Sequence, residues 1–235
     1  ATDKLRIGLV PNERGLERAL KSGCKAIAIF TAASDGFSNA NINMSVEQSL
    51  NLFEDVAAKA LENGMMVRGY VSTIFECPYH GPVAPERVLE VAQTLLGMGC
   101  YEVSLGDTTG VGTPAETRRL LDVLLPNIDA ERLAIHLHDT WGMAVANAIT
   151  ALSSGIRRFD ASAGGLGGCP FAKTASGNLA TEDLLYALNH LGFETGVDLD
   201  QVALASSKLA EHLEHSLPSR VHQALKAQAQ ADSSC

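Results

Sequence analysis

Two histidines separated by one residue are the strongest sign of chemistry in this sequence. His136 and His138 lie in the stretch LAIHLH over residues 133–138, whose apolar and β-branched character predicts a β-strand. Because alternate side chains of a strand share a face, both imidazoles point the same way, about 6.6 Å apart along the chain. That spacing allows both rings to bind one cation, and a pair of hydrogen-bonded core histidines is the alternative.

A glycine-rich segment, GGLGGCPFAKTASGN over residues 164–178, is the second candidate. The glycines before Cys169 allow positive φ and close backbone approach, which predicts a mobile lid whose thiol donates or accepts a proton on closure. A phosphate-binding glycine turn with an incidental cysteine is the alternative. The amide oxygen of Asn178 suits a hard cation such as Mg²⁺ or Mn²⁺, although an asparagine after a glycine also commonly forms a turn or a helix cap.

Two charged residues lie within or just after other predicted strands. Asp107, in the stretch SLGDTTG, follows a strand end, where it either orients a substrate hydroxyl or a histidine, or caps the next turn. Arg68 lies inside the stretch VRGYVS. Because an unpaired buried charge is too costly, we expect Arg68 to be either functional or part of a structural ion pair.

Short β-branched runs alternate with longer stretches of helical period along the chain. The predicted strands cover residues 5–10, 26–30, 66–72, 101–106, 133–138 and 158–163. The predicted helices between them cover residues 13–23, 45–64, 84–99, 113–127 and 141–155. Sequence signals for capping boxes at Ser45 and Thr113 support these limits. The repetition predicts parallel strands joined by right-handed crossovers.

The pattern favours a closed barrel over an open sheet. Polar residues follow most of the predicted strands, as they do on the active-site face of a (β/α)8 barrel, and no GxGxxG follows the first strand. The predicted fold is therefore α/β, a TIM-type barrel. Six parallel strands are recognised where eight are needed, and we expect the first two strands to be the ones lacking. We expect the barrel over residues 1–200, a C-terminal helix packed on it over 201–222, and a disordered polar tail over 223–235.

Composition narrows the class of protein. The 235 residues are 46% hydrophobic and 19% charged, which is ordinary for a globular domain, and the net charge of −9 speaks against nucleic-acid or anionic-membrane partners. No apolar run approaches the ~18 residues of a membrane span. The cysteines are five, an odd number, without a CxxC, which indicates a reducing compartment and neither a disulfide framework nor a cysteine-based zinc site. Cys235 is interpreted as a disordered bystander in the tail, and a redox-sensitive thiol is the alternative.

Three stretches together resemble the 3-hydroxy-3-methylglutaryl-CoA lyase family, metal-dependent lyases of a TIM-barrel superfamily. They are YEVSLGDTTGVGTP, HLHDTWGMAVAN and AGGLGGCPFAKTASGNLATEDL. The likeness runs from about residue 5 to about residue 200, which is most of the chain. The GLGGCP element with its downstream GN is specific to this lyase branch, whereas the HxH with a distant asparagine is shared across the superfamily.

The resemblance implies a retro-Claisen cleavage of 3-hydroxy-3-methylglutaryl-CoA to acetyl-CoA and acetoacetate, a reaction of leucine degradation and ketone-body formation. It implies Mg²⁺ or Mn²⁺ as the cofactor, bound by His136, His138 and Asn178, with Cys169 as the catalytic cysteine on the lid. The further residues that it implies are Asp107, His136 and Arg68 for catalysis, and Arg68, Ser104, Gly167 and Gly168 for substrate binding.

Three functional residues of the family have no counterpart in this sequence. The family's first strand carries an arginine and an aspartate ligand of the metal, and its second region carries a glutamate near the metal. All three belong to the strands that are not recognised here. We therefore expect this chain alone to show little or no lyase activity.

Other functions remain open from the sequence. The alternatives are a Claisen-type synthase, an acyl-CoA lyase with a longer substrate, a metal hydrolase with HxH ligands, and a non-catalytic truncated scaffold. The resemblance also implies a CoA thioester as the small-molecule partner and a homodimer at full length. It implies the cytoplasm if the source is bacterial, or the mitochondrial matrix if it is eukaryotic.

Overall fold

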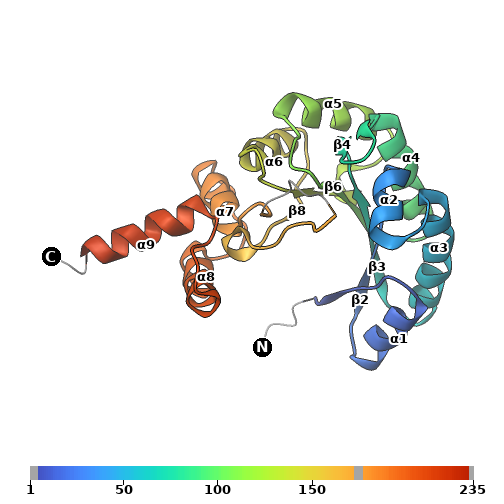
Figure 1. Ribbon diagram of the computed structural model, residues 1–235, viewed down its shortest axis with the longest axis horizontal. Coiled ribbons are helices and arrows are strands. Elements are labelled where there is room, and N and C mark those ends of the chain that lie inside the picture. Colours follow the sequence, from blue (N-terminus) through green and yellow to red (C-terminus); the bar gives the residue numbers. More distant parts are fainter. Residues whose placement is uncertain (1–4, 172–176, 233–235) are drawn as a thin grey trace.

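Six parallel strands form one curled sheet in the computed structural model, which describes residues 5–171 and 177–232 (Figure 1). Their order in the sheet is their order in the chain. The strands are β1 (Ile7–Leu9), β2 (Ala26–Ala32), β3 (Met66–Ser72), β6 (Glu102–Asp107), β7 (Leu133–Leu137) and β8 (Phe159–Asp160). Each of them falls within or overlaps a predicted strand, so the predicted α/β fold with six parallel barrel strands is confirmed.

Five helices cover the convex face of this sheet (Figure 1). They are α1 (Glu13–Lys21), α3 (Val46–Glu62), α4 (Pro85–Gly97), α5 (Pro114–Leu124) and α6 (Ala144–Ser153). The predicted capping boxes are present, because the side chains of Ser45 and Thr113 accept from the N3 backbone of α3 and α5. Each capping box fixes where a crossover helix begins, and so where the preceding loop ends.

The hydrophobic core lies between the sheet and these helices, because alternate strand residues face the helices. Ile27, Ile29, Leu105 and Ile135 on the strands are fully buried against helix residues such as Leu95. The other strand residues, many of them polar, face the concave side of the sheet. The concave side is therefore where polar chemistry can gather.

Two elements after the strand ends were not predicted. The stretch after β2 forms α2 (Asp35–Ile42), which begins at the N-cap Ser34, and the stretch after β3 forms the hairpin of β4 (Glu76–Cys77) and β5 (Gly81–Pro82). Both stretches were interpreted only as polar strand ends. Two short 3-10 helices, Ala130–Arg132 and Ala163–Gly165, complete the connections.

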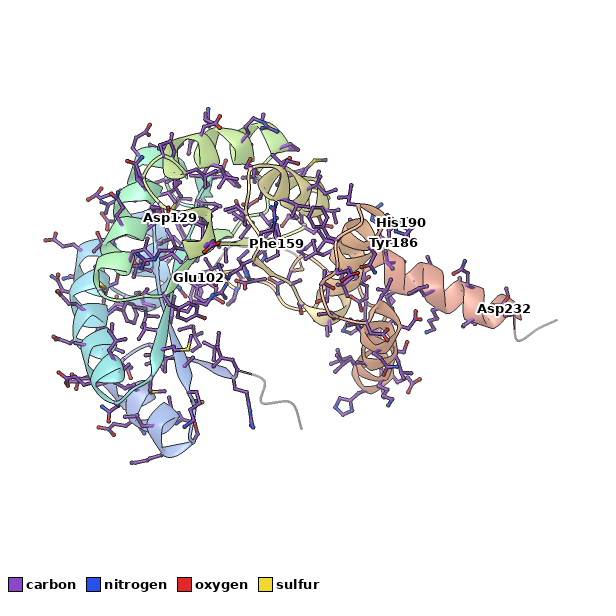
Figure 2. All side chains as sticks on the ribbon, turned by 180° about the vertical axis from the view of Figure 1, so that it is seen from behind. Glu102, Asp129, Phe159, Tyr186, His190 and Asp232 are labelled. Carbon is purple, nitrogen blue, oxygen red and sulfur yellow. The ribbon has the colours of Figure 1, made fainter. Side chains whose placement is uncertain are left out.

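The C-terminal region forms three helices, and here the expectation of a disordered tail is wrong. After α7 (Thr181–His190) come α8 (Leu199–Leu213) and α9 (Arg220–Asp232), so most of the stretch expected to be a disordered tail is helical. Its alanines, glutamines and lysine favour helix, and Asp183 caps the start of α9 by accepting from the N–H of Val221 at 2.9 Å. His222 of α9 is only 3% exposed, so this helix packs against the rest of the chain. Asp232 marks the far end of α9, well away from the sheet, and Cys235 lies outside the described residues (Figure 2).

The sheet has two open edges among the described strands, β1 and β8. Leu9 on β1 is 65% exposed, although its side chain is apolar. This exposure agrees with the expectation that further strands of the barrel belong beside β1. In the part of the chain that the structure describes, no helix is long and apolar enough to cross a membrane.

Candidate active site

The two histidines lie together at the carboxyl end of β7. His136 is within the strand and His138 directly follows it, with ring centroids 5.4 Å apart. Both line a cavity of about 390 Å³, together with Tyr70, Ser72 and Cys169. Burial, and then His136, lower the pKa of His138 to about 4, so that its imidazole is neutral near pH 7. A neutral imidazole is the form that binds a metal ion.

Asn178 is held beside His138 by backbone pairing. The two residues form an antiparallel bridge, and the N–H of Leu179 donates to the carbonyl of Leu137 at 2.8 Å. The side-chain Nδ2 of Asn178 donates to the carbonyl of Leu166 at 2.8 Å. Because this bond uses the amide nitrogen, the amide oxygen is the atom left to bind a cation.

These three residues fit part of a divalent cation site. The Nδ1 atom of His138 is buried without a hydrogen-bond partner, and two imidazoles with one amide oxygen are ligands that Mn²⁺ or Mg²⁺ accepts. No group of three or more histidine, cysteine, aspartate or glutamate side chains converges to hold a metal in residues 5–171 and 177–232. An ion bound by these three residues therefore needs further oxygen ligands.

Cys169 lies on the same cavity as the histidines. Its side chain is half-buried and packs against a small cluster formed by Ala32, Phe37 and Cys77. Gly167, two residues earlier, has φ +100°, and a Cβ there would lie 2.5 Å from Nδ2 of Asn178. This glycine therefore makes room for the asparagine. The expected lid includes residues 172–176, which lie outside the described residues, so its movement stays a prediction.

The base of the glycine-rich segment is fixed by a buried glutamate that the sequence reasoning missed. Glu182 in α7 is fully buried, and its carboxylate accepts from the N–H of Gly164 at 2.9 and 3.0 Å. Gly164 itself has φ +67°, and a Cβ there would lie 2.4 Å from Cδ1 of Leu217. The motif ATEDL contained the signal, because an acid in the first turn of a helix commonly accepts backbone N–H groups.

Arg68 is part of a buried ion-pair network on the concave face. Its Nε lies 2.6 Å from Oε1 of Glu102, and one terminal nitrogen lies 2.8 Å from Oδ1 of Asp160. The same nitrogen donates to the hydroxyl of Tyr70, over whose ring the guanidinium lies at 4.8 Å. Of the two predicted alternatives for Arg68, the structure has the ion pair.

Asp160 connects this network to the histidines, and it was not singled out from the sequence. Its Oδ2 accepts from the hydroxyl of Ser104 at 2.7 Å and lies 3.6 Å from Nδ1 of His136. Burial would raise the pKa of Asp160, but His136 and Arg68 outweigh it and lower that pKa to about 2. Asp160 is therefore a carboxylate placed to orient His136.

Asp107 supports the loop after β6. Its carboxylate accepts from the N–H groups of Gly110 and Gly112, both at 2.9 Å. Burial raises the pKa of Asp107 to about 6, although these backbone hydrogen bonds act in the opposite direction. Of the two predicted alternatives, the structure shows the turn cap.

Comparison with known proteins gives a consistent result over most of the chain. The model of the HMGL-like family matches residues 2–209. The hydroxymethylglutaryl-CoA lyase of Pseudomonas mevalonii is 50% identical over 219 residues, which is 93% of this chain and 73% of that protein. A Pseudomonas aeruginosa protein named 3-hydroxy-3-isohexenylglutaryl-CoA/hydroxy-methylglutaryl-CoA lyase is 50% identical over 94% of this chain and 74% of its own length.

The solved structures agree with the sequence comparison. The crystal structure of hydroxymethylglutaryl-CoA lyase from Pseudomonas aeruginosa superposes with a TM-score of 0.94 at 48% identity, covering 97% of this chain and 76% of that one. The chain spans between 48% and 74% of the length of the curated relatives compared with it.

Proposed function

The chain belongs to the HMGL-like family, and from this premise we propose that it forms the main part of a hydroxymethylglutaryl-CoA lyase. The reaction is the cleavage of 3-hydroxy-3-methylglutaryl-CoA to acetyl-CoA and acetoacetate. The observation that supports this proposal best is the arrangement of Cys169 and the two histidines around one cavity, with Asn178 paired to His138. This arrangement joins a cation site to a proton donor.

His136, His138 and Asn178 are the residues that would hold the cation, Mg²⁺ or Mn²⁺. When bound, the cation supplies positive charge that lowers the pKa of the substrate's tertiary hydroxyl. The chain keeps His138 neutral by burial and keeps Asn178 in place through backbone pairing with β7. Asp160 would orient the ring of His136, because the two residues lie opposite each other on the neighbouring strands β7 and β8.

Cys169 is the proposed proton donor. Loss of the hydroxyl proton to a base allows the bond between the carbinol carbon and the α-carbon of the thioester to break, and the electron pair stays on the acetyl-CoA side as an enolate. The enolate carbon then takes the thiol proton of Cys169. The packing of Cys169 against the cluster of Ala32, Phe37 and Cys77 keeps one side of the thiol away from water.

The other candidate residues receive positioning roles in this proposal. Arg68 and Ser104 hold Asp160, and Asp107 holds the loop that follows β6. Gly167 gives Asn178 its space, and Gly168 stays a predicted substrate contact. Arg68 and Ser104 would therefore act through Asp160 and would not touch the substrate themselves.

The broader setting of the proposal follows from the relatives. A CoA thioester is the substrate class, and a longer acyl chain is a second candidate, because one 50%-identical relative is named for an isohexenylglutaryl thioester as well. We propose a homodimer for the full-length protein, located in the cytoplasm of a bacterium or in the mitochondrial matrix of a eukaryote. Leucine degradation is the proposed pathway.

Two substitutions in the complete protein that carries this chain test the proposal. Cys169→Ala is expected to abolish acetoacetate formation while Mn²⁺ binding, followed by electron paramagnetic resonance, stays unchanged. Asn178→Ala is expected to weaken both. Cys24→Ala, which changes a half-buried cysteine between α1 and β2, is the control and should leave both measurements unaltered. Full turnover by the Cys169→Ala variant would contradict the proposed role.

A further inference from the structure

The β4–β5 hairpin lies beside the catalytic end of the sheet because it directly follows β3. Glu76 pairs with Pro82 and Cys77 with Gly81, so the tip of the hairpin is residues 78–80. On one side the hairpin packs against α2, where a Cβ at Gly36 would lie 2.8 Å from the ring of His80. The hairpin therefore packs against α2, whose Phe37 lines the cavity.

The other side of the hairpin holds the segment that carries Cys169. The hydroxyl of Tyr79 donates to the carbonyl of Phe171 at 2.8 Å, which joins residues 92 positions apart. Phe171 is two residues after Cys169, and the residue between them is Pro170, whose ring restricts φ. At the other end of this short span, Cys169 packs against the cluster that includes Cys77 of β4. The short segment 169–171 is thus held at both ends, by the hydrogen bond from Tyr79 to Phe171 and by the packing of Cys169 against the cluster that includes Cys77.

The hydrogen bond to Phe171, and not burial, accounts for the position of the Tyr79 side chain. The ring of Tyr79 is 50% exposed, so it contributes little to the core, and its defined contact is through the hydroxyl. A hydrogen bond of this kind is exchanged against water and is modest in strength. It is nevertheless sufficient to bias a short, glycine-flanked segment toward one position.

We propose that Tyr79 is a positioning residue, which holds the carbonyl of Phe171 and thereby keeps the thiol of Cys169 on the cavity shared with His136 and His138. This proposal rests on the proposed function for the chemical role of Cys169. The position of the thiol can be measured without turnover, so failure of the positioning role and failure of the lyase assignment are distinguishable.

The test is the alkylation rate of Cys169 by iodoacetamide in the Tyr79→Phe variant. The modified peptides are quantified by mass spectrometry, with Cys24, a half-buried thiol near α1, as the reference within the same molecule. Loss of one modest hydrogen bond is expected to raise the ratio of Cys169 to Cys24 labelling about three- to tenfold. The melting temperature is expected to stay unchanged.

Two further variants make the result specific. Tyr186→Phe is the matched control, because Tyr186 is 49% exposed and stacks on His190 in α7, away from the hairpin (Figure 2). It should leave the labelling ratio unaltered. Incorporation of 4-aminophenylalanine at position 79 restores an N–H donor and should return the ratio toward that of the original protein.

Three results would overturn the proposal. They are an unchanged labelling ratio in Tyr79→Phe, an equal rise in Tyr186→Phe, and a rise that 4-aminophenylalanine does not reverse. A rise confined to Tyr79→Phe and reversed by the amine supports it, whether or not the preparation cleaves a CoA thioester.

Discussion

Replacing Arg68 by methionine is expected to destabilise the protein strongly. Methionine fills most of the volume of the arginine stem, so the change mainly removes charge and hydrogen bonds. Arg68 is 6% exposed and contacts Glu102 at 2.6 Å and Asp160 at 2.8 Å. Without it, two carboxylates on the concave face lose their shared cation.

The expected cost follows from what each carboxylate retains. Two charge-assisted hydrogen bonds at about 1.5–3 kcal/mol each would give about 3–6 kcal/mol. Glu102 keeps Arg158 at 2.8 Å, and Asp160 keeps the hydroxyl of Ser104, which reduces the loss. The lower part of that range, about 3 kcal/mol, is therefore expected, and it agrees with values for broken buried pairs. In a chain of this length it corresponds to a fall in melting temperature of about 6–12 °C.

Urea unfolding followed by circular dichroism measures this cost, with Arg87→Met as the control. Arg87 forms an exposed ion pair with Glu90 on α4 at 2.6 Å, so the same substitution there should cost less than about 1 kcal/mol. The two variants lose the same side chain, one from a buried network with two carboxylates and one from a single exposed pair. Their difference measures what burial and the second carboxylate add.

The pH dependence provides a second check. The pKa of Asp160 is about 2 in the folded protein, below its usual 3.8, in part because of Arg68. A lowered carboxyl pKa contributes stability that is present above about pH 4 and is lost as the pH falls toward 2. The gap between the original protein and Arg68→Met should therefore narrow below pH 4. A cost under about 1 kcal/mol at pH 7, or a gap that widens in acid, would refute this account of the network.

Two other substitutions test the loops around the site. Gly164→Ala should cost about 2–4 kcal/mol in urea unfolding, because the residue has φ +67° and its Cβ would meet Leu217. Gly192→Ala is the control, because Gly192 has φ +81° but open space where a Cβ would lie. This control should cost only the backbone strain of about 1–2 kcal/mol. Burial raises the pKa of Asp107 to about 6, and a raised carboxyl pKa means that stability falls as the pH rises from about 4 to 6. Relative to Asp107→Asn, the original protein should lose about 3 kcal/mol over that interval, and a parallel pH profile for the two would contradict the raised pKa.

The sheet could be predicted from the sequence because its signals are local. Runs such as LRIGLV and LAIHLH carry the composition of buried parallel strands, and glycines and capping boxes mark the helix ends. The His136 and His138 pair was recognised for the same reason, since both lie on one strand. Strand periodicity alone places their side chains on the same face.

Asp160 was missed because its importance depends on strand register. Arg68 lies on β3 and Asp160 on β8, and neither stretch contains a sign of the other. Only the pairing of β7 with β8, in which His136 lies opposite Asp160, brings the carboxylate to the histidine. Such long-range pairs are not visible in a local pattern.

The unpredicted elements depend on tertiary contacts for the same reason. The sequence of α2, DGFSNANI, contains glycine and two asparagines, which are weak helix formers. The helix is held by Phe37, which is 2% exposed, and by Asp35, whose Oδ1 accepts from the N–H of Val46 at the start of α3. In contrast, α9 has good helix formers, and its polar composition was wrongly interpreted as disorder.

The strands follow one another in the sheet in the same order as in the chain, and this has a consequence for biosynthesis. Each β–α unit that leaves the ribosome can dock directly on the unit made just before it, because no strand must be inserted between two earlier ones. β7 supplies the two histidines, but the bridge between His138 and Asn178 forms only after a further forty residues have emerged. The sheet can thus assemble during translation before the proposed cation site is complete, and a nascent chain released before residue 178 would lack the amide that we propose as a ligand.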